Sequence, residues 1–233
     1  MRILGAVAVK LHCQDDNLAE KTDVRRLGQR TLSDLDFITY SKHAGGLDPV
    51  FVSLDFVPNE RFNAFYGRGR RIYEGEDGSV HVDVFLDRLE FCHTIDFDGR
   101  LELDYPTITV SDILLQKLQI VKITEKDLKD MLLLLECHGV AHSGEESRDK
   151  FDASYISGLL SQDWGFYYTA TTNFRKAGAF SQNTDAYDCE TIAKRISDLV
   201  TRIEEAHKSL RWKLRAKVGA NRIWYQEVED VRR

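Results

Sequence analysis

Three aspartates at strand-like positions are the residues of this chain best suited to chemistry. Asp34 and Asp36 are separated by one residue and lead into an apolar run that predicts a strand over 36–40. Because side chains at i and i+2 of a strand point to one face, these carboxylates should lie side by side, where they repel unless a cation lies between them. Asp83 interrupts a second apolar run, 80–86. Three carboxylates on neighbouring strands favour a Mg²⁺ site for phosphoryl or nucleotidyl transfer.

The same aspartates have a structural alternative. A D-x-D triplet occurs by chance in acidic proteins, and an aspartate at the end of a strand often caps a turn or is simply solvated. The residues around the triplet therefore have to decide between the two interpretations.

The first part of the chain, residues 1–105, reads as α/β. Asp77-Gly78 between two strand patterns is a hairpin signal. Residues 15–30 are polar and without strong periodicity, which predicts a loop. The other predicted elements are a strand at 2–4, a helix from Gly5-Ala6 to about Cys13, helices at 47–56 and 59–66, the hairpin strands 70–74 and 80–86, and a short strand at 100–103.

The second part, residues 106–233, reads as mostly helical. Ser111 caps a helix with an apolar stripe that ends at Val121, and Thr124 opens another that stops at Gly139. Further helices are predicted near 152–161, 163–178 and 188–207. The polar stretch within 140–150 is the best candidate for a linker between the two parts.

Charge is spread unevenly along the chain. The net charge of −6 argues against non-specific nucleic-acid binding by the whole protein. Residues 74–104 hold ten acidic and two basic side chains, whereas residues 208–233 hold eight basic and three acidic ones. An acidic surface for cations and a basic surface for phosphates are therefore expected.

Compartment can be argued from the cysteines and from hydropathy. The four cysteines are far apart and form no C-x-x-C, so we expect a reducing cytoplasm and no disulfide framework. A composite zinc site is an alternative, because three of the cysteines stand beside a histidine. No apolar run approaches the roughly 18–20 residues of a membrane span, and no signal peptide is expected.

The order of these features resembles the nucleotidyltransferase superfamily: a strand ending in Gly5-Ala6, then Arg30-x-x-Ser33-Asp34-x-Asp36, then a strand carrying Asp83. More narrowly, the chain is similar to bacterial abortive-infection and toxin–antitoxin type nucleotidyltransferases, in which a helix lysine precedes a K-D-x-x-D-like segment. Lys117 and Lys126-Asp127-Leu128-Lys129-Asp130 match that pattern. The resemblance covers residues 1–138. Ala6 departs from it, because Ser or a second Gly is usual there.

The resemblance implies a nucleotidyltransferase-type mixed sheet core and a role for each matched residue. Asp34, Asp36 and Asp83 would be catalytic and would hold Mg²⁺ or Mn²⁺. The set implied to bind nucleotide is Gly5, Ala6, Arg30, Ser33, Lys117, Lys126 and Asp127. Lys117 could instead be a solvated residue of its helix face, and Asp127 could be a helix cap.

The activity implied is transfer of NMP from an NTP to an acceptor hydroxyl, of RNA, protein or a small molecule. The toxin-type likeness favours an RNA or protein acceptor and a cognate antitoxin as partner. Lys208 to Lys217, interleaved with Trp212, suggests an RNA contact or a solvated helix face, and Arg68-Gly69-Arg70-Arg71 borders either the nucleotide cleft or solvent. A non-catalytic nucleotide- or partner-binding module with the same fold is the alternative function.

Overall fold

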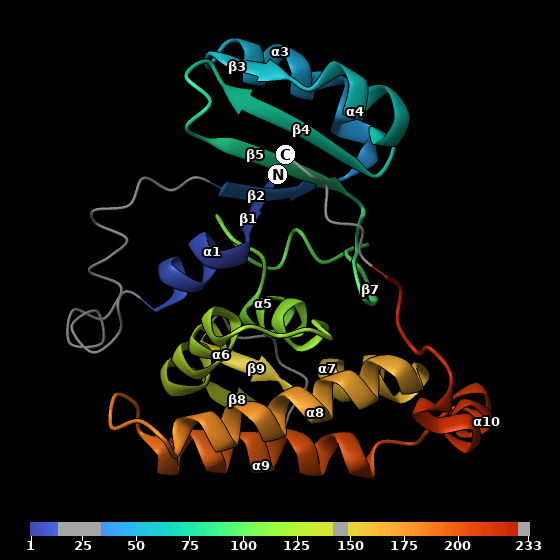
Figure 1. The fold of residues 1–233 in the computed structure, drawn as a ribbon. Helices are drawn as coiled ribbons and strands as arrows, with labels where there is room; N and C mark the ends of the chain where they lie inside the picture. The colour runs from blue at the N-terminus through green and yellow to red at the C-terminus, as the bar shows by residue number, and fades with distance from the viewer. Residues whose placement is uncertain (14–33, 142–148, 228–233) are drawn as a thin grey trace. The chain divides into compact units, whose positions relative to one another are not determined.

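A computed structural model describes residues 1–13, 34–141 and 149–227 (Figure 1). The chain divides into two compact units. The sheet unit comprises Met1–Leu89 and Ile95–Thr109, and the helical unit comprises Glu90–Thr94 and Val110–Arg233. The mixed α/β class expected from the sequence is confirmed. The loop predicted at 15–30 lies outside the described residues, as does most of the polar stretch proposed as a linker, at 142–148.

The sheet unit is built on a five-stranded mixed sheet in the order β1-β2-β5-β4-β3. Its strands are β1 (Arg2–Leu4), β2 (Asp34–Thr39), β3 (Phe56–Pro58), β4 (Arg70–Gly75) and β5 (His81–Leu86). The central pair, β2 and β5, is parallel, and all other neighbours are antiparallel. The predicted hairpin is confirmed as β4 and β5, with Gly78 in its turn at φ +68°.

One face of this sheet is apolar. The helices of the sheet unit are α1 (Gly5–His12), the 3-10 helix η2 (Ser41–Gly46), α3 (Leu47–Val52) and α4 (Glu60–Tyr66). Leu47 and Phe51 of α3 pack with Tyr73, Val82 and Val84 in one buried cluster. Burial of such side chains contributes roughly 1.5–3 kcal/mol each, so this face holds α3 on the sheet. Register then directs the alternate residues of β2 and β5 to the opposite face.

Two sequence predictions for the sheet unit are wrong. The helix predicted at 47–56 ends at Val52, because residues 53–55 turn the chain, with Asp55 at φ +63°, and Phe56 enters β3. No strand forms at 100–103: residues 97–104 make successive turns, in which Arg100 N–H donates to the Phe97 carbonyl at 3.0 Å. The short strands β6 (Arg88–Glu90) and β7 (Thr94–Asp96), which pair with each other, were not predicted.

The helical unit confirms the predicted helices closely. Its helices are α5 (Val110–Leu118), α6 (Glu125–Cys137), α7 (Ala153–Gln162), α8 (Trp164–Ser181), α9 (Cys189–Glu205), α10 (Leu210–Val218) and the 3-10 helix η3 (Gly219–Asn221). The long helices α8 and α9 run side by side (Figure 1). Val121 lies beyond the end of α5, so the predicted stripe is shorter than expected. The unit also contains an unpredicted parallel pair, β8 (Gly139–Ala141) and β9 (Lys150–Asp152).

Side-chain caps explain where several of these helices begin. Thr124 and Asp127 form a reciprocal capping box at the start of α6, and Asp163 accepts the Phe166 N–H at the start of α8. Each cap satisfies backbone N–H groups that the helix itself cannot. No helix within residues 1–13, 34–141 and 149–227 is long and apolar enough to cross a membrane.

Candidate active site

The polar face of the five-stranded sheet brings three sequence-predicted aspartates together. In the parallel pair β2–β5, Asp36 stands opposite Asp83 and Asp34 stands opposite His81. Residues directly opposite in register, and residues two apart on one strand, share a face. We call this side of β2 and β5, defined by Asp34, Asp36, His81 and Asp83, the carboxylate face. Along it Asp34 is exposed, Asp36 is half-buried and Asp83 is buried.

Gly5 joins this face from the start of α1. Its φ of +71° lies in the left-handed region, and a Cβ built on it would lie 2.3 Å from Asp36 Oδ2. A glycine is therefore required by both the backbone and the neighbouring carboxylate. Leu4 is the N-cap residue of α1, and its side chain has no oxygen with which to cap the first turn. Gly5 and Ala6 are the first two residues of that turn. The amino end of α1 and the Asp36 carboxylate are thus neighbours.

Arg70, which the sequence only placed in an ambiguous basic cluster, binds the third aspartate. Its Nε donates to Asp83 Oδ1 at 3.0 Å, and its Nη2 lies 2.9 Å from Asp83 Oδ2. This is the two-pronged arrangement that gives arginine–carboxylate pairs their strength and direction. The Arg70 guanidinium also lies over the rings of Phe85 and Phe62, at 5.2 and 5.7 Å from their centroids.

The carboxylate face fits a divalent cation by donor type. Hard oxygen ligands from two adjacent strands suit Mg²⁺ or Mn²⁺. Both oxygens of Asp83 face Arg70, however, and the described part of the chain contains no three His, Cys, Asp or Glu side chains grouped to hold a metal. The residue types therefore fit the ion, in an arrangement where a guanidinium neutralises Asp83. The composite zinc site likewise has no such cluster among these residues, and none of the four cysteines forms a disulfide.

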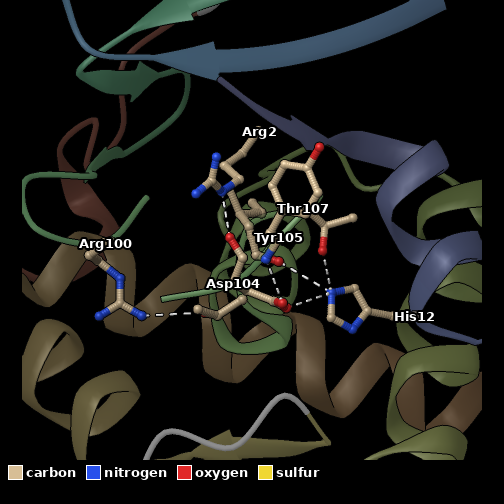
Figure 2. Close-up of polar contacts among 8 residues, drawn as sticks. Arg2, His12, Arg100, Asp104, Tyr105 and Thr107 are labelled. Atoms are coloured by element: carbon tan, nitrogen blue, oxygen red, sulfur yellow. Dashed lines mark hydrogen bonds and ion pairs between the residues drawn. The ribbon is translucent and has the colours of Figure 1, made fainter. Parts of the chain in front are cut away.

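A buried polar cluster fixes the carboxyl end of α1 (Figure 2). His12 Nε2 lies 2.8 Å from Thr107 Oγ1, 3.2 Å from the Ile108 carbonyl and 3.4 Å from Asp104 Oδ2. Arg2 donates to the backbone carbonyl of Asp104. A catalytic triad would need the acid and the hydroxyl on different ring nitrogens, whereas here both lie at Nε2. The cluster therefore anchors α1, whose other end places Gly5 beside Asp36.

The lysine and aspartates matched by the resemblance form a buried ion cluster in the helical unit. Lys117 Nζ lies 3.1 Å from Asp127 Oδ1 and 2.7 Å from Asp130 Oδ2. Burial disfavours the charged forms, but attraction between these charges outweighs it, so the pKa of Lys117 is raised and that of Asp127 is lowered. Lys117 is therefore not a solvated face residue, and Asp127 is indeed a helix cap. Lys126 is exposed on α6.

A second feature of the helical unit is a cavity of about 530 Å³ beside α10. Arg211 and Trp212, from the basic segment interpreted as either an RNA contact or a solvated helix face, line it together with Trp164, Trp224 and His93. His93 stacks on a phenylalanine ring and its Nε2 lies 2.8 Å from a threonine hydroxyl. Burial lowers the pKa of His93 to about 4, against a smaller opposing effect of a nearby aspartate, so the ring is neutral at pH 7.

The remaining predicted residues, Arg30 and Ser33, lie outside the described residues. Arg70 and His81 were not among the predicted site residues. The signal that could have identified them is two-residue spacing, since Arg70 begins the strand antiparallel to that of Asp83 and His81 precedes Asp83 by two positions. Comparison with protein-family models, with curated proteins and with solved structures gives no match to this chain.

Proposed function

We propose that this chain is a divalent-cation-dependent nucleotidyltransferase that moves NMP from an NTP to an acceptor hydroxyl. The observation that carries the proposal is the approach of the α1 amino end to Asp36, which leaves no room for a side chain at Gly5. The amino end of a helix favours an anion such as a phosphate, and the carboxylate beside it suits the cation that accompanies a triphosphate.

The proposed reaction is an in-line displacement. The acceptor oxygen forms a bond to the α-phosphorus, the bond from that phosphorus to the bridging oxygen breaks, and pyrophosphate leaves with the electron pair. The backbone at Gly5 and Ala6 orients the triphosphate, and Asp83 takes the proton of the acceptor hydroxyl. Asp34, Asp36 and Asp83 would hold Mg²⁺ or Mn²⁺, which would supply neutralisation of phosphate charge and activation of the acceptor oxygen.

For the acceptor we favour RNA. Arg211 is exposed beside Trp212 on α10, and both line the cavity of the helical unit. A cationic side chain next to an aromatic ring suits a phosphate followed by a stacked base. A protein acceptor and a cognate antitoxin remain proposals without a surface feature of their own.

A second candidate function is favoured by one specific observation. Arg70 contacts both oxygens of Asp83, so a guanidinium rather than a metal engages the third carboxylate. A module that binds nucleotide without turnover would retain such a pair. It predicts nucleotide binding with no label transferred to any acceptor.

The test is label transfer from each of four α-³²P-labelled NTPs with Mg²⁺, with and without total RNA. Wild type should label RNA or protein from at least one NTP, and Asp36→Asn should lower the rate by roughly 100-fold or more. Glu74→Gln is the matched control, because Glu74 is an exposed acid on the same sheet face, opposite His81, and should transfer normally. Transfer by Asp36→Asn at the wild-type rate refutes the assignment. Nucleotide binding without any transfer by wild type establishes the second candidate.

A further inference from the structure

Helix α10 exposes an apolar stripe on the side that does not pack on the helical unit. Its Trp212 ring packs edge to face against a tyrosine ring of α8, with 5.1 Å between centroids, and its Arg215 guanidinium lies 4.8 Å from the centroid of a tryptophan ring of α8. Leu210, Leu214 and Val218 are 74%, 56% and 39% exposed. Residues four apart share one face of a helix, so these three side chains form a continuous stripe.

Basic side chains border this stripe on both sides. At about 100° per residue, Lys213 and Lys217 follow one edge of the stripe and Arg211 follows the other. All three are exposed. Residues 206–226 contain six lysines and arginines and no aspartate or glutamate, although the whole chain has a net charge of −6. The outward face of α10 therefore combines exposed aliphatic side chains with a border of a single sign of charge.

That combination selects among the surfaces that could cover the stripe. A second copy of α10 would bring like charges together, which disfavours a symmetric pair of these helices. Nucleic acid complements the basic border, but its phosphate backbone offers no continuous apolar surface to the aliphatic side chains. An anionic phospholipid surface complements both, because aliphatic side chains enter the boundary of the acyl chains while lysine and arginine side chains reach the headgroups.

We propose that α10 is a peripheral docking helix for anionic phospholipid bilayers. Leu210, Leu214 and Val218 enter the interface, and the basic border pairs with lipid phosphates. Such a helix lies in the plane of the interface and binds reversibly, with a strength set by its buried apolar area and its charge. The inference does not rest on the proposed transferase function, because it assigns the aliphatic stripe, which the proposed RNA contact at Arg211 and Trp212 leaves unused.

The experiment measures binding of the full chain to vesicles by cosedimentation. Wild type should bind vesicles of phosphatidylcholine mixed with phosphatidylserine about tenfold more tightly or more than vesicles of phosphatidylcholine alone, and added salt should weaken that binding. Leu214→Gln should bind the mixed vesicles about fivefold more weakly than wild type, because it removes an apolar anchor. Leu54→Gln is the matched control: Leu54, in the sheet unit, has nearly the same exposure, 59% against 56%, and its variant should bind as wild type does.

A second pair of variants tests the basic border. Lys213→Gln combined with Lys217→Gln should weaken binding to the mixed vesicles about tenfold or more, because each lysine near an anionic surface contributes to the attraction. Lys122→Gln combined with Lys150→Gln removes two exposed lysines elsewhere in the same unit and should bind as wild type does. Glutamine is a good helix former, so the variants on α10 should keep the helix, as circular dichroism would verify.

Two results would overturn the inference. Wild type that does not bind the mixed vesicles has no lipid-docking face, whatever else binds α10. Binding that is lost in the double lysine variant but unchanged in Leu214→Gln would show that charge alone acts and that the stripe is not inserted. Binding of total RNA in place of vesicles, weakened in the double lysine variant, would assign the basic border to nucleic acid instead.

Discussion

Each unit of the protein buries charged side chains, but the two units balance those charges differently. In the helical unit, Lys117 is 9% exposed and is held between Asp127 and Asp130, which are 18% and 19% exposed. Asp127 also closes a capping box. In the sheet unit, Asp83 is paired with Arg70, and Asp36 and Asp34 follow on the same face.

The difference separates an architectural cluster from a candidate site. The contacts of Lys117 join α5 to the first turns of α6, and their geometry is complete within the unit. On the carboxylate face, Asp34 and Asp36 line up beside the bidentate pair of Arg70 with Asp83, next to a helix start that requires glycine. Clustered carboxylates repel one another unless cations lie near them, which is why the proposed site is placed on this face.

The largest effect we expect is on stability, from Lys117→Met. Removing the lysine leaves two mostly buried carboxylates without their cation, which should cost about 3–5 kcal/mol of unfolding free energy. Urea unfolding should show a lower midpoint with an unchanged slope. Lys126→Met, on the exposed face of α6, should change stability by less than about 0.5 kcal/mol.

The same variant tests the comparison directly. If the Lys117 cluster is architectural, the Lys117→Met variant should bind a non-hydrolysable NTP analogue as tightly as wild type does, at a temperature where the variant is folded. A large loss of nucleotide affinity in the folded variant would place Lys117 in the nucleotide site, as the resemblance implied, and would erase the distinction between the two regions.

The second effect is a pH dependence that belongs to the helical unit. His93 titrates near 6.5 when unfolded, and its pKa falls to about 4 when folded, because burial disfavours the imidazolium. The folded state then binds fewer protons, so stability is fully present above pH 6.5 and is lost as pH falls from about 6.5 to about 4. The total loss should be about 3 kcal/mol.

Unfolding free energies measured at pH 7.5, 6.0 and 4.5 check this prediction. His93→Gln should flatten the dependence over that window, whereas His207→Gln, which alters an exposed histidine of the same unit, should leave it unchanged. An equally steep dependence in His93→Gln would assign the acid sensitivity to other groups, the carboxylate face among them.

Much of the fold followed from local signals in the sequence. Asp77-Gly78 predicted the hairpin, and Thr124 with Asp127 predicted the start of α6, because turns and caps depend on a few adjacent residues. The end of α3 was missed because apolar residues recur from Leu47 to Phe56, as they do in a helix. In the structure Phe56 instead pairs with β4 and belongs to a strand.

The candidate site was predicted in part, for a similar reason. Two-residue spacing predicted that Asp34 and Asp36 share one face, and Asp83 was expected on a neighbouring strand. The structure supplies the register that sets Asp83 opposite Asp36. The partnership of Arg70 depends on which strand lies beside β5 and in which register, and neither is encoded locally. The assignment of residues 90–94 to the helical unit is equally non-local.

The smallest stability effect, with the most specific functional consequence, is expected from Gly5→Ala. An alanine at φ +71° costs about 1–2 kcal/mol, and its Cβ, 2.3 Å from Asp36 Oδ2, must displace that carboxylate. Gly78 offers a matched control, because its φ of +68° imposes the same backbone cost but its Cβ position has no neighbour within 4 Å. Urea unfolding should therefore show a loss in both variants, at least as large in Gly5→Ala as in Gly78→Ala. Label transfer should fall about 100-fold in Gly5→Ala alone, since a displacement of about 1 Å at reacting groups has that effect. Equal transfer by the two variants would mean that the contact between α1 and Asp36 serves the fold rather than the chemistry.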